Sequence, residues 1–337
     1  MTRVTSLLLC ALCLLGCDPD PEPGNGNLDA DWELVAEDLP EALLSVWAGD
    51  GLVYAVGADK GQGPAVLRLR DGGWERLATG ERGDLWWVER APDGTFWMVG
   101  EGGLVLRHDS ADDSFTRLSV NTDLTLYGVH FAAGGEGWIV GGDPDADSAA
   151  VLLRGDAGGF AADPAFDASA HPALFKVWVQ AEDLVWFVGV EGTLLRFDGS
   201  AYESLTTGTR DRLLTVRGAP GESPLMVGGQ NNARLLVVEG DELVDRSLEV
   251  DEGFAPALNG VAVAPGGHAT VAGNRGFVAS ASSGGAWQVQ EALTEQHLHA
   301  VAVEDSGEAW AVGGAILTDA LDRGVLLHRG ERSAPAL

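Results

Sequence analysis

The sequence predicts an all-β fold, a seven-bladed β-propeller of four-stranded antiparallel blades, and three observations carry that prediction. A Leu-x-x-Val pattern occurs seven times, and a glycine follows each leucine by 14 residues in the first copy and by 15 in the others. These glycines recur every 39 to 48 residues, a period typical of propeller blades. The chain also holds 47 glycines and 11 tryptophans, which favours short strands joined by tight turns. The leucines are Leu43, Leu85, Leu126, Leu174, Leu213, Leu258 and Leu298, and the glycines are Gly57, Gly100, Gly141, Gly189, Gly228, Gly273 and Gly313.

Each repeat divides into four expected strands, as residues 85–118 illustrate. The first strand carries Leu-x-x-Val (LWWVER, 85–90), and the second places an aromatic residue before Val-Gly (TFWMVG, 95–100). The third is an apolar run that leads to arginine (LVLRH, 104–108), and the fourth opens with an aromatic residue (FTRL, 115–118). A β-helix would have shorter rungs, and a pair of β-sandwiches would not keep one period along the chain, so a propeller is favoured.

The last repeat has no fourth strand of its own. Its third strand can be recognised at 325–328 (VLLH), but no aromatic strand follows in RGERSAPAL. Near the start of the chain, Trp32-Glu33-Leu34 matches the fourth strand at 74–77, and Trp32 precedes Leu43 by the same 11 residues that separate Trp74 from Leu85. We therefore expect the segment 31–37 to complete the last blade and close the ring.

The expected turns between the third and fourth strands carry a family resemblance. RLRDGGW (68–74), RFDGSAY (196–202) and SASSGGAW (280–287) resemble degenerate Asp-boxes of the BNR type. Together with Trp-x-Val-Gly and the arginine that follows the third strand, they make the chain similar to propellers of the photosystem II assembly and stability factor type. The resemblance implies the fold, but such repeats occur in proteins of many activities.

The N-terminus has the features of a lipoprotein signal. Arg3 precedes an apolar run at 7–15 that is too short to span a bilayer, and Leu14-Leu15-Gly16-Cys17 resembles a bacterial lipobox. The implied domains are a signal peptide at 1–16, a lipidated Cys17 with a Pro/Asp-rich tether to residue 30, and a propeller at 31–337. The predicted location is the cell envelope, membrane-anchored and either periplasmic or surface-exposed. An ordinary signal peptide is the alternative.

Composition excludes several classes of function. All three cysteines lie within the first 17 residues, so the exported body has neither a disulfide nor a cysteine nucleophile. The 51 acidic residues outnumber the 21 basic ones, for a net charge of -30, which disfavours nucleic acid and anionic lipid surfaces as partners. We expect a monomer that contacts the membrane only through its lipid anchor.

The sequence suggests two kinds of chemistry and favours neither. Asp-box repeats suggest a sialidase-like glycoside hydrolase, which needs an arginine cluster and a Tyr/Glu pair. Tyr54 and Tyr202 occupy structural positions of the repeat, and Tyr127 is a weak candidate nucleophile. Asp143, Asp145 and Asp147 have the spacing of a calcium loop, but the sixth-position glycine is missing and Arg154 stands at the twelfth position. A hydrated surface loop is favoured over a Ca²⁺ site, and no other cofactor is expected.

The first strands contain the candidate binding residues. Side chains alternate between the two faces of a strand, so the residues on either side of each Leu-x-x-Val valine are expected to face the centre of the ring. There they could bind a small ligand or a peptide end. The alternative is a channel in which these charges only neutralise one another. Long connections between second and third strands, and between blades, mark one face as the candidate interaction surface. We therefore predict a lipid-anchored, non-enzymatic binding or scaffolding module for an envelope protein or saccharide. The candidate residues are Trp47, Trp87, Glu89, His130, Lys176, Trp178 and Arg217.

Overall fold

The computed structural model describes residues 30–337 apart from 220–221, 241, 247 and 251–252. The predicted signal peptide, Cys17 and nearly all of the tether fall outside the described residues and stay predictions. None of the helices in the described part of the chain has the length and apolar character needed to span a bilayer.

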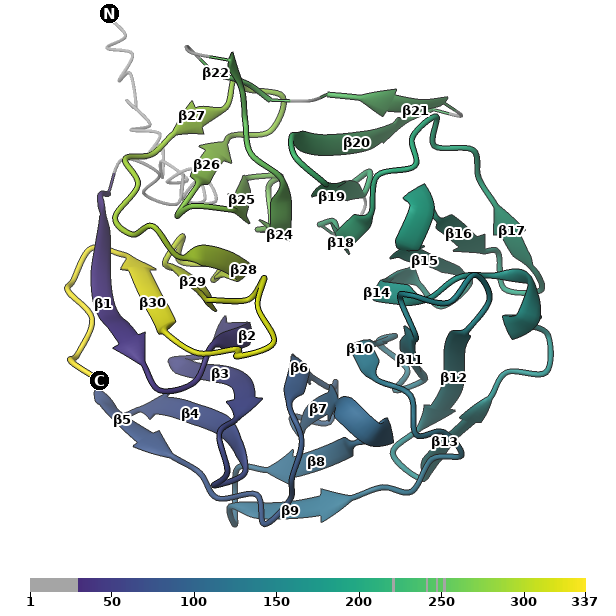
Figure 1. Cartoon of the computed structure of the whole chain (residues 1–337), viewed down its shortest axis with the longest axis horizontal. Coiled ribbons are helices and arrows are strands. Elements are labelled where there is room, and N and C mark those ends of the chain that lie inside the picture. Colours follow the sequence, from purple (N-terminus) through teal and green to yellow (C-terminus); the bar gives the residue numbers. More distant parts are fainter. Residues whose placement is uncertain (1–29, 220–221, 241, 247, 251–252) are drawn as a thin grey trace, which may run out of the picture.

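Seven four-stranded antiparallel sheets are arranged in a ring, which confirms the predicted propeller (Figure 1). Within each blade the first strand is innermost and the fourth is outermost. Blade 1 contains β2 (Leu43–Gly49), β3 (Leu52–Asp59), β4 (Pro64–Arg70) and β5 (Gly73–Arg76). Blade 2 contains β6 (Leu85–Arg90), β7 (Phe96–Gly100), β8 (Val105–Asp109) and β9 (Ser114–Arg117). Blade 3 contains β10 (Leu126–Phe131), β11 (Gly137–Gly142), β12 (Ala150–Asp156) and β13 (Gly159–Ala162).

The remaining blades follow the same order, except that the outermost strand of blade 7 comes from the start of the chain. Blade 4 contains β14 (Leu174–Ala181), β15 (Leu184–Gly189), β16 (Leu194–Phe197) and β17 (Tyr202–Ser204). Blade 5 contains β18 (Leu213–Arg217), β19 (Leu225–Gly229), β20 (Ala233–Glu239) and β21 (Glu242–Asp245). Blade 6 contains β24 (Leu258–Val263), β25 (Ala269–Gly273), β26 (Val278–Ala281) and β27 (Gln288–Val289). Blade 7 contains β28 (His297–Val303), β29 (Ala309–Gly314), β30 (Gly324–Arg329) and β1 (Trp32–Leu39).

Short elements occupy the connections. Three single-turn 3-10 helices are η1 (Glu101–Gly103), η2 (Ala168–Ala170) and η3 (Val190–Gly192). A small hairpin of β22 (Glu249–Val250) and β23 (Gly253–Phe254) lies between blades 5 and 6, and the repeat pattern does not predict it.

The seven closing glycines allow a close approach between the first and second strands of every blade. In each blade the leucine of Leu-x-x-Val lies opposite the closing glycine, as Leu85 lies opposite Gly100. A Cβ added at any of these glycines would lie 1.9 to 2.5 Å from the carbonyl oxygen of the residue before that leucine. Real Cβ contacts are essentially never that short, so the fixed spacing in the sequence reflects a steric requirement.

The aromatic residue of the second strand and the arginine of the third strand are cross-strand neighbours. Register places Tyr54 opposite Arg68, Trp97 opposite Arg107, Trp138 opposite Arg154, and Trp186 opposite Arg196. In blade 6 both members are replaced by hydroxyl residues, and the Oγ1 of Thr270 lies 3.0 Å from the Oγ of Ser280. The aromatic residue before Val-Gly and the arginine of the third strand therefore form one cross-strand pair, which stabilises the middle of most blades.

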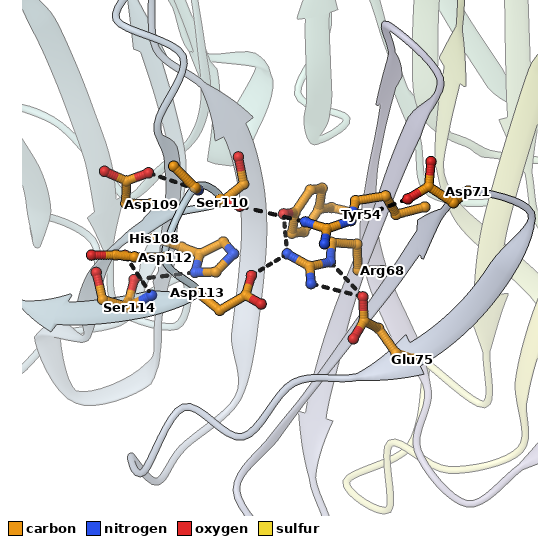
Figure 2. A network of polar contacts seen from close by, with 12 residues as sticks. Tyr54, Arg68, Asp71, Glu75, His108, Asp109, Ser110, Asp112, Asp113 and Ser114 are labelled. Carbon is orange, nitrogen blue, oxygen red and sulfur yellow. Dashed lines mark hydrogen bonds and ion pairs between the residues drawn. The ribbon is translucent and has the colours of Figure 1, made fainter.

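Arg68 also joins blade 1 to blade 2, as Figure 2 shows. Its side chain is 1% exposed, and its guanidinium lies 2.7 Å from Glu75 on β5 and 2.5 Å from Asp113 in the β8–β9 turn. The hydroxyl of Tyr54 accepts a weaker bond of 3.4 Å from the same group. A buried guanidinium between two carboxylates fixes the angle between neighbouring blades.

β1 closes the ring as the sequence predicts. It pairs antiparallel with β30, and Trp32 packs beneath the Arg329 guanidinium, 5.3 Å from it. His328 of β30 is 1% exposed, with Nδ1 2.9 Å from Glu33 of β1 and Nε2 2.7 Å from Glu308. In Figure 1, β1 forms the outer edge of the blade whose other strands are C-terminal. The two ends of the chain thus share one sheet.

Deletion of residues 31–37 should destabilise the whole ring, because it uncovers the edge of β30 and removes both Trp32 and the Glu33 contact to His328. We expect the melting temperature to fall by at least about 10 °C. Removal of residues 18–28 is the control and should leave the melting temperature unchanged. Equal melting temperatures for the two deletions, measured by calorimetry, would show that β1 does not hold the ring closed.

Candidate functional site

A cavity of about 990 Å³ lies at the centre of the ring. It opens on the face that carries the connections between second and third strands and between blades, which the sequence marked as the candidate interaction surface. Its rim includes the β11–β12 loop of blade 3, the β29–β30 loop of blade 7 and the segments that enter blades 4 and 5. Its wall comes from the innermost strands through Trp86, Tyr127, Phe175, Lys176, Leu214, Asn259 and His299.

A β-bulge at the start of every innermost strand explains why these residues line the wall. The register between first and second strands shifts directly after the leucine in all seven blades, for example between Leu85 and Trp87. The residue after the leucine, such as Trp86, is therefore the extra one and turns toward the cavity. Simple alternation from the valine does not predict this position. Among the seven wall residues the sequence therefore predicts Lys176 as a binding residue and Tyr127 as a weak candidate nucleophile, and it does not predict the other five.

Four aromatic rings form a continuous arc along the wall. The ring of Trp86 contacts Tyr127 edge-on at 5.3 Å, and Tyr127 contacts Phe175 in the same way at 5.4 Å. On its other side Trp86 contacts His299 at 5.7 Å. The Nδ1 of His299 donates to the carbonyl of Leu44, and burial lowers the pKa of this imidazole to about 3. The arc is thus uncharged and spans blades 7, 2, 3 and 4.

Lys176 lies at the base of the cavity and is only 4% exposed. Its Nζ donates to the carbonyl of Tyr127 at 2.6 Å and lies 4.5 Å from the ring centroid of Trp87. Burial, together with the nearby Arg217 charge, lowers the pKa of this amine to about 7. Gly128 makes room for it, because a Cβ there would lie 3.3 Å from the Cδ of Lys176.

An ion pair spans the channel below this base. Arg217 of blade 5 and Glu89 of blade 2 approach to 2.8 Å, and the Arg217 guanidinium lies 4.9 Å from the Trp87 ring. A further bond of 3.2 Å joins Arg217 to the carbonyl of Val177. Burial raises the pKa of Glu89 and lowers that of Arg217, while each charge favours ionisation of the other. Trp87 contacts both Lys176 and Arg217, so it connects the amine of the larger cavity to this ion pair.

The other predicted residues lie toward the opposite face. Trp47, Glu89 and His130 line a smaller hollow of about 360 Å³. The Nδ1 of His130 accepts a hydrogen bond from the backbone N–H of Val179 at 3.2 Å, and burial keeps the pKa of this imidazole well below its usual value. Trp178 is 5% exposed and packs over Gly218. Of the seven predicted residues, Lys176 lines the larger cavity, and Trp47, Glu89 and His130 line the smaller hollow.

The aspartate loop, residues 143–147, forms a turn at the rim of the cavity. Within the described residues, no three His, Cys, Asp or Glu side chains form a group that could hold a metal ion. Asp143 instead accepts a hydrogen bond from the backbone N–H of Asp145 at 3.0 Å, which closes a turn, and Asp145 and Asp147 line the cavity rim. The loop contributes negative charge to the rim beside Arg210 and Arg212.

The sequence predicts structural positions for Tyr54 and Tyr202 and a candidate site position for Tyr127, and the structure places them accordingly. Tyr54 is fully buried and stacks on Phe96 at 4.0 Å, and Tyr202 donates to Asp163 at 2.8 Å. Tyr127 lies on the cavity wall, where burial raises the pKa of its hydroxyl.

Solved structures share the fold at low sequence identity. Virginiamycin B lyase from Staphylococcus aureus, a catalytically inactive variant with quinupristin, aligns over 88% of this chain and 99% of its own, with a TM-score of 0.68 and 11% identity. The WD40 propeller domain of Doa1 aligns over 91% and 99%, with a TM-score of 0.68 and 13% identity. YCF48 from Cyanidioschyzon merolae aligns over 89% and 99%, with a TM-score of 0.65 and 16% identity.

These similarities establish the fold and leave the function open, since a lyase and a WD40 domain are both among them. No family model and no curated sequence matches the chain. The likeness to YCF48 is one of fold, which is what the resemblance found in the sequence implies. The Asp-box and lipoprotein assignments stay predictions.

Replacement of Arg217 by Met should cost about 2–4 kcal/mol of unfolding free energy, because it leaves the largely buried Glu89 carboxylate without a partner. The matched control is Arg246→Met, whose ion pair with Glu239 at 2.6 Å is exposed and should be worth less than about 1 kcal/mol. Chemical denaturation measures both costs. Equal losses for the two variants would show that the Arg217–Glu89 pair is no more shielded from solvent than the surface pair.

Proposed function

We propose that this protein is a non-enzymatic binding module of the cell envelope, which holds part of an envelope protein or saccharide in the central cavity. The observation that carries the proposal is the construction of that cavity. An arc of aromatic rings lines the cavity at the centre of the ring, and the Lys176 amine lies on the same wall. A concave, mostly aromatic cavity with one placed polar group suits capture of a ligand or a chain end.

The rim supports recognition of a larger partner around that group. It carries carboxylates from Asp145, Asp147 and Glu191, and guanidinium groups from Arg210 and Arg212. Leu317, also at the rim, is 65% exposed. Loops of mixed charge with an exposed apolar residue, held on a rigid ring, are suited to contacts with a partner surface.

Glycoside hydrolysis is the weaker alternative. A sialidase-like mechanism would use Tyr127, the one tyrosine on the cavity wall among the described residues, as its nucleophile. The raised pKa of its hydroxyl disfavours the phenolate that such a nucleophile needs. Turnover of a sialoside by the purified protein would favour this alternative over binding.

The proposed anchor predicts a simple change in fractionation. Cys17→Ala removes the thiol that would carry the diacylglyceryl group, so the protein should leave the membrane pellet and appear in the soluble fraction. Immunoblots of fractionated cells measure this. The Cys13→Ala variant serves as the control and should remain with the membrane, whereas continued pelleting of Cys17→Ala would refute the anchor.

Partner capture can be mapped with a photo-crosslinking amino acid. Placed at Leu317 on the cavity rim, it should crosslink to an envelope component, and Trp86→Ala in the same chain should reduce the yield several-fold. The control position is Val289, which is 48% exposed on the outermost strand β27. Mass spectrometry and glycan staining identify the product as protein or saccharide. Crosslinking at both positions, or yields independent of Trp86, would contradict the proposal.

A further inference from the structure

Lys176 is an unusual residue in this chain. Of the 21 basic residues only Lys60 and Lys176 are lysines. Lys60 is exposed near blade 7, where its Nζ donates to the carbonyl of Ala320 at 2.5 Å. Lys176 instead places an amine at the base of an aromatic cavity, where the rest of the wall offers no charge.

The ammonium of Lys176 has no carboxylate partner among the described residues. One of its three hydrogens is donated to the Tyr127 carbonyl, and the face of Trp87 lies beside it. The carboxylate of Glu89, which belongs to the same network through Trp87 and Arg217, is already bonded to Arg217. A buried ammonium that lacks a counter-ion is costly, so the site gains most from a ligand that brings an anionic group.

The charged and titratable groups around Lys176 leave its charge unbalanced. Arg217 from β18 repels the Lys176 charge, and Glu89 from β6 is paired with Arg217 and does not contact Lys176. His299 from β28 is neutral, and so is His130 from β10. Asp145, Asp147 and Glu191 lie at the rim beside Arg210 and Arg212. The base of the cavity is therefore cationic in a chain whose net charge is -30.

We propose that the cavity binds a carboxylate attached to an apolar or aromatic group, with the carboxylate on the Lys176 ammonium and the apolar group against the arc of Trp86, Tyr127 and Phe175. This rests on the proposed binding function and names the chemistry of the ligand. Both a small carboxylic acid and the free C-terminus of a peptide carry that chemistry. Selectivity comes from the ion pair between the ligand carboxylate and Lys176. A neutral amide of the same shape would leave the Lys176 ammonium without a counter-ion.

The presence of only two lysines gives a direct experiment. In the full chain with ¹³C-labelled lysine, NMR follows one signal from Lys60 and one from Lys176 while benzoate or benzamide is added. Benzoate should move the Lys176 signal saturably and leave Lys60 unmoved, and benzamide should bind at least tenfold more weakly. Because binding requires the ammonium, benzoate affinity should fall about tenfold for each pH unit above the Lys176 pKa of about 7.

Two further measurements test whether the carboxylate can come from a peptide C-terminus and whether Lys176 is the residue that binds it. The peptide Ala-Ala-Phe with a free C-terminus, compared with its amide, tests whether a chain end enters the cavity as a small acid does. Lys176→Met should abolish the preference for benzoate over benzamide, whereas Lys60→Met should retain it. Methionine is similar in volume and needs no counter-ion, so the variant should fold.

The contradicting outcomes are distinct. Equal binding of benzoate and benzamide would overturn the carboxylate preference but leave a functional cavity. Absence of any response of the Lys176 signal to benzoate would overturn the inference as well. In either case the crosslinking from Leu317 decides separately whether the cavity face binds a partner.

Discussion

In each of the seven blades, a backbone carbonyl oxygen lies so close to the closing glycine that a Cβ atom there would be only 1.9 to 2.5 Å from it. Each contact joins the end of a second strand to the start of a first strand, as Gly100 meets the carbonyl of Asp84. In that blade the next residue, Glu101, donates its N–H to the same carbonyl at 2.9 Å. The blade geometry depends on this approach, because it fixes where the innermost strand begins.

The cavity follows from the same constraint. The leucine lies opposite the glycine, and the innermost strand then has one extra residue relative to the second strand. The side chain of that extra residue, such as Trp86, turns toward the axis of the ring. Bulky residues at this position in blades 2, 3, 4 and 7 build the aromatic arc, and the next position in blade 4 supplies Lys176. One steric requirement of the backbone thus sets both the fold and the wall of the candidate site.

The sequence is informative about the fold because the constraint repeats, and less so about the site because the site differs in every blade. The spacing of leucine and glycine predicts seven blades, and the match of Trp32 to Trp74 predicts how the ring closes. Alternation from the valine places Trp87, Glu89 and Arg217 at the channel, but it cannot show that Glu89 meets Arg217 across the ring, 128 residues away. The bulge that exposes Trp86 depends on strand register, which periodicity alone does not give.

The most direct test compares two glycine substitutions in one chain. Gly100→Ala would place a Cβ 2.0 Å from the Asp84 oxygen, whereas Gly73 on β5 has no atom within 4 Å of its added Cβ and needs no left-handed backbone. The measurement is the free energy of unfolding by chemical denaturation. We expect Gly100→Ala to cost about 3 kcal/mol or more, and Gly73→Ala to be neutral or slightly stabilising. Similar values for the two variants would contradict the claim that the close approach determines the blade.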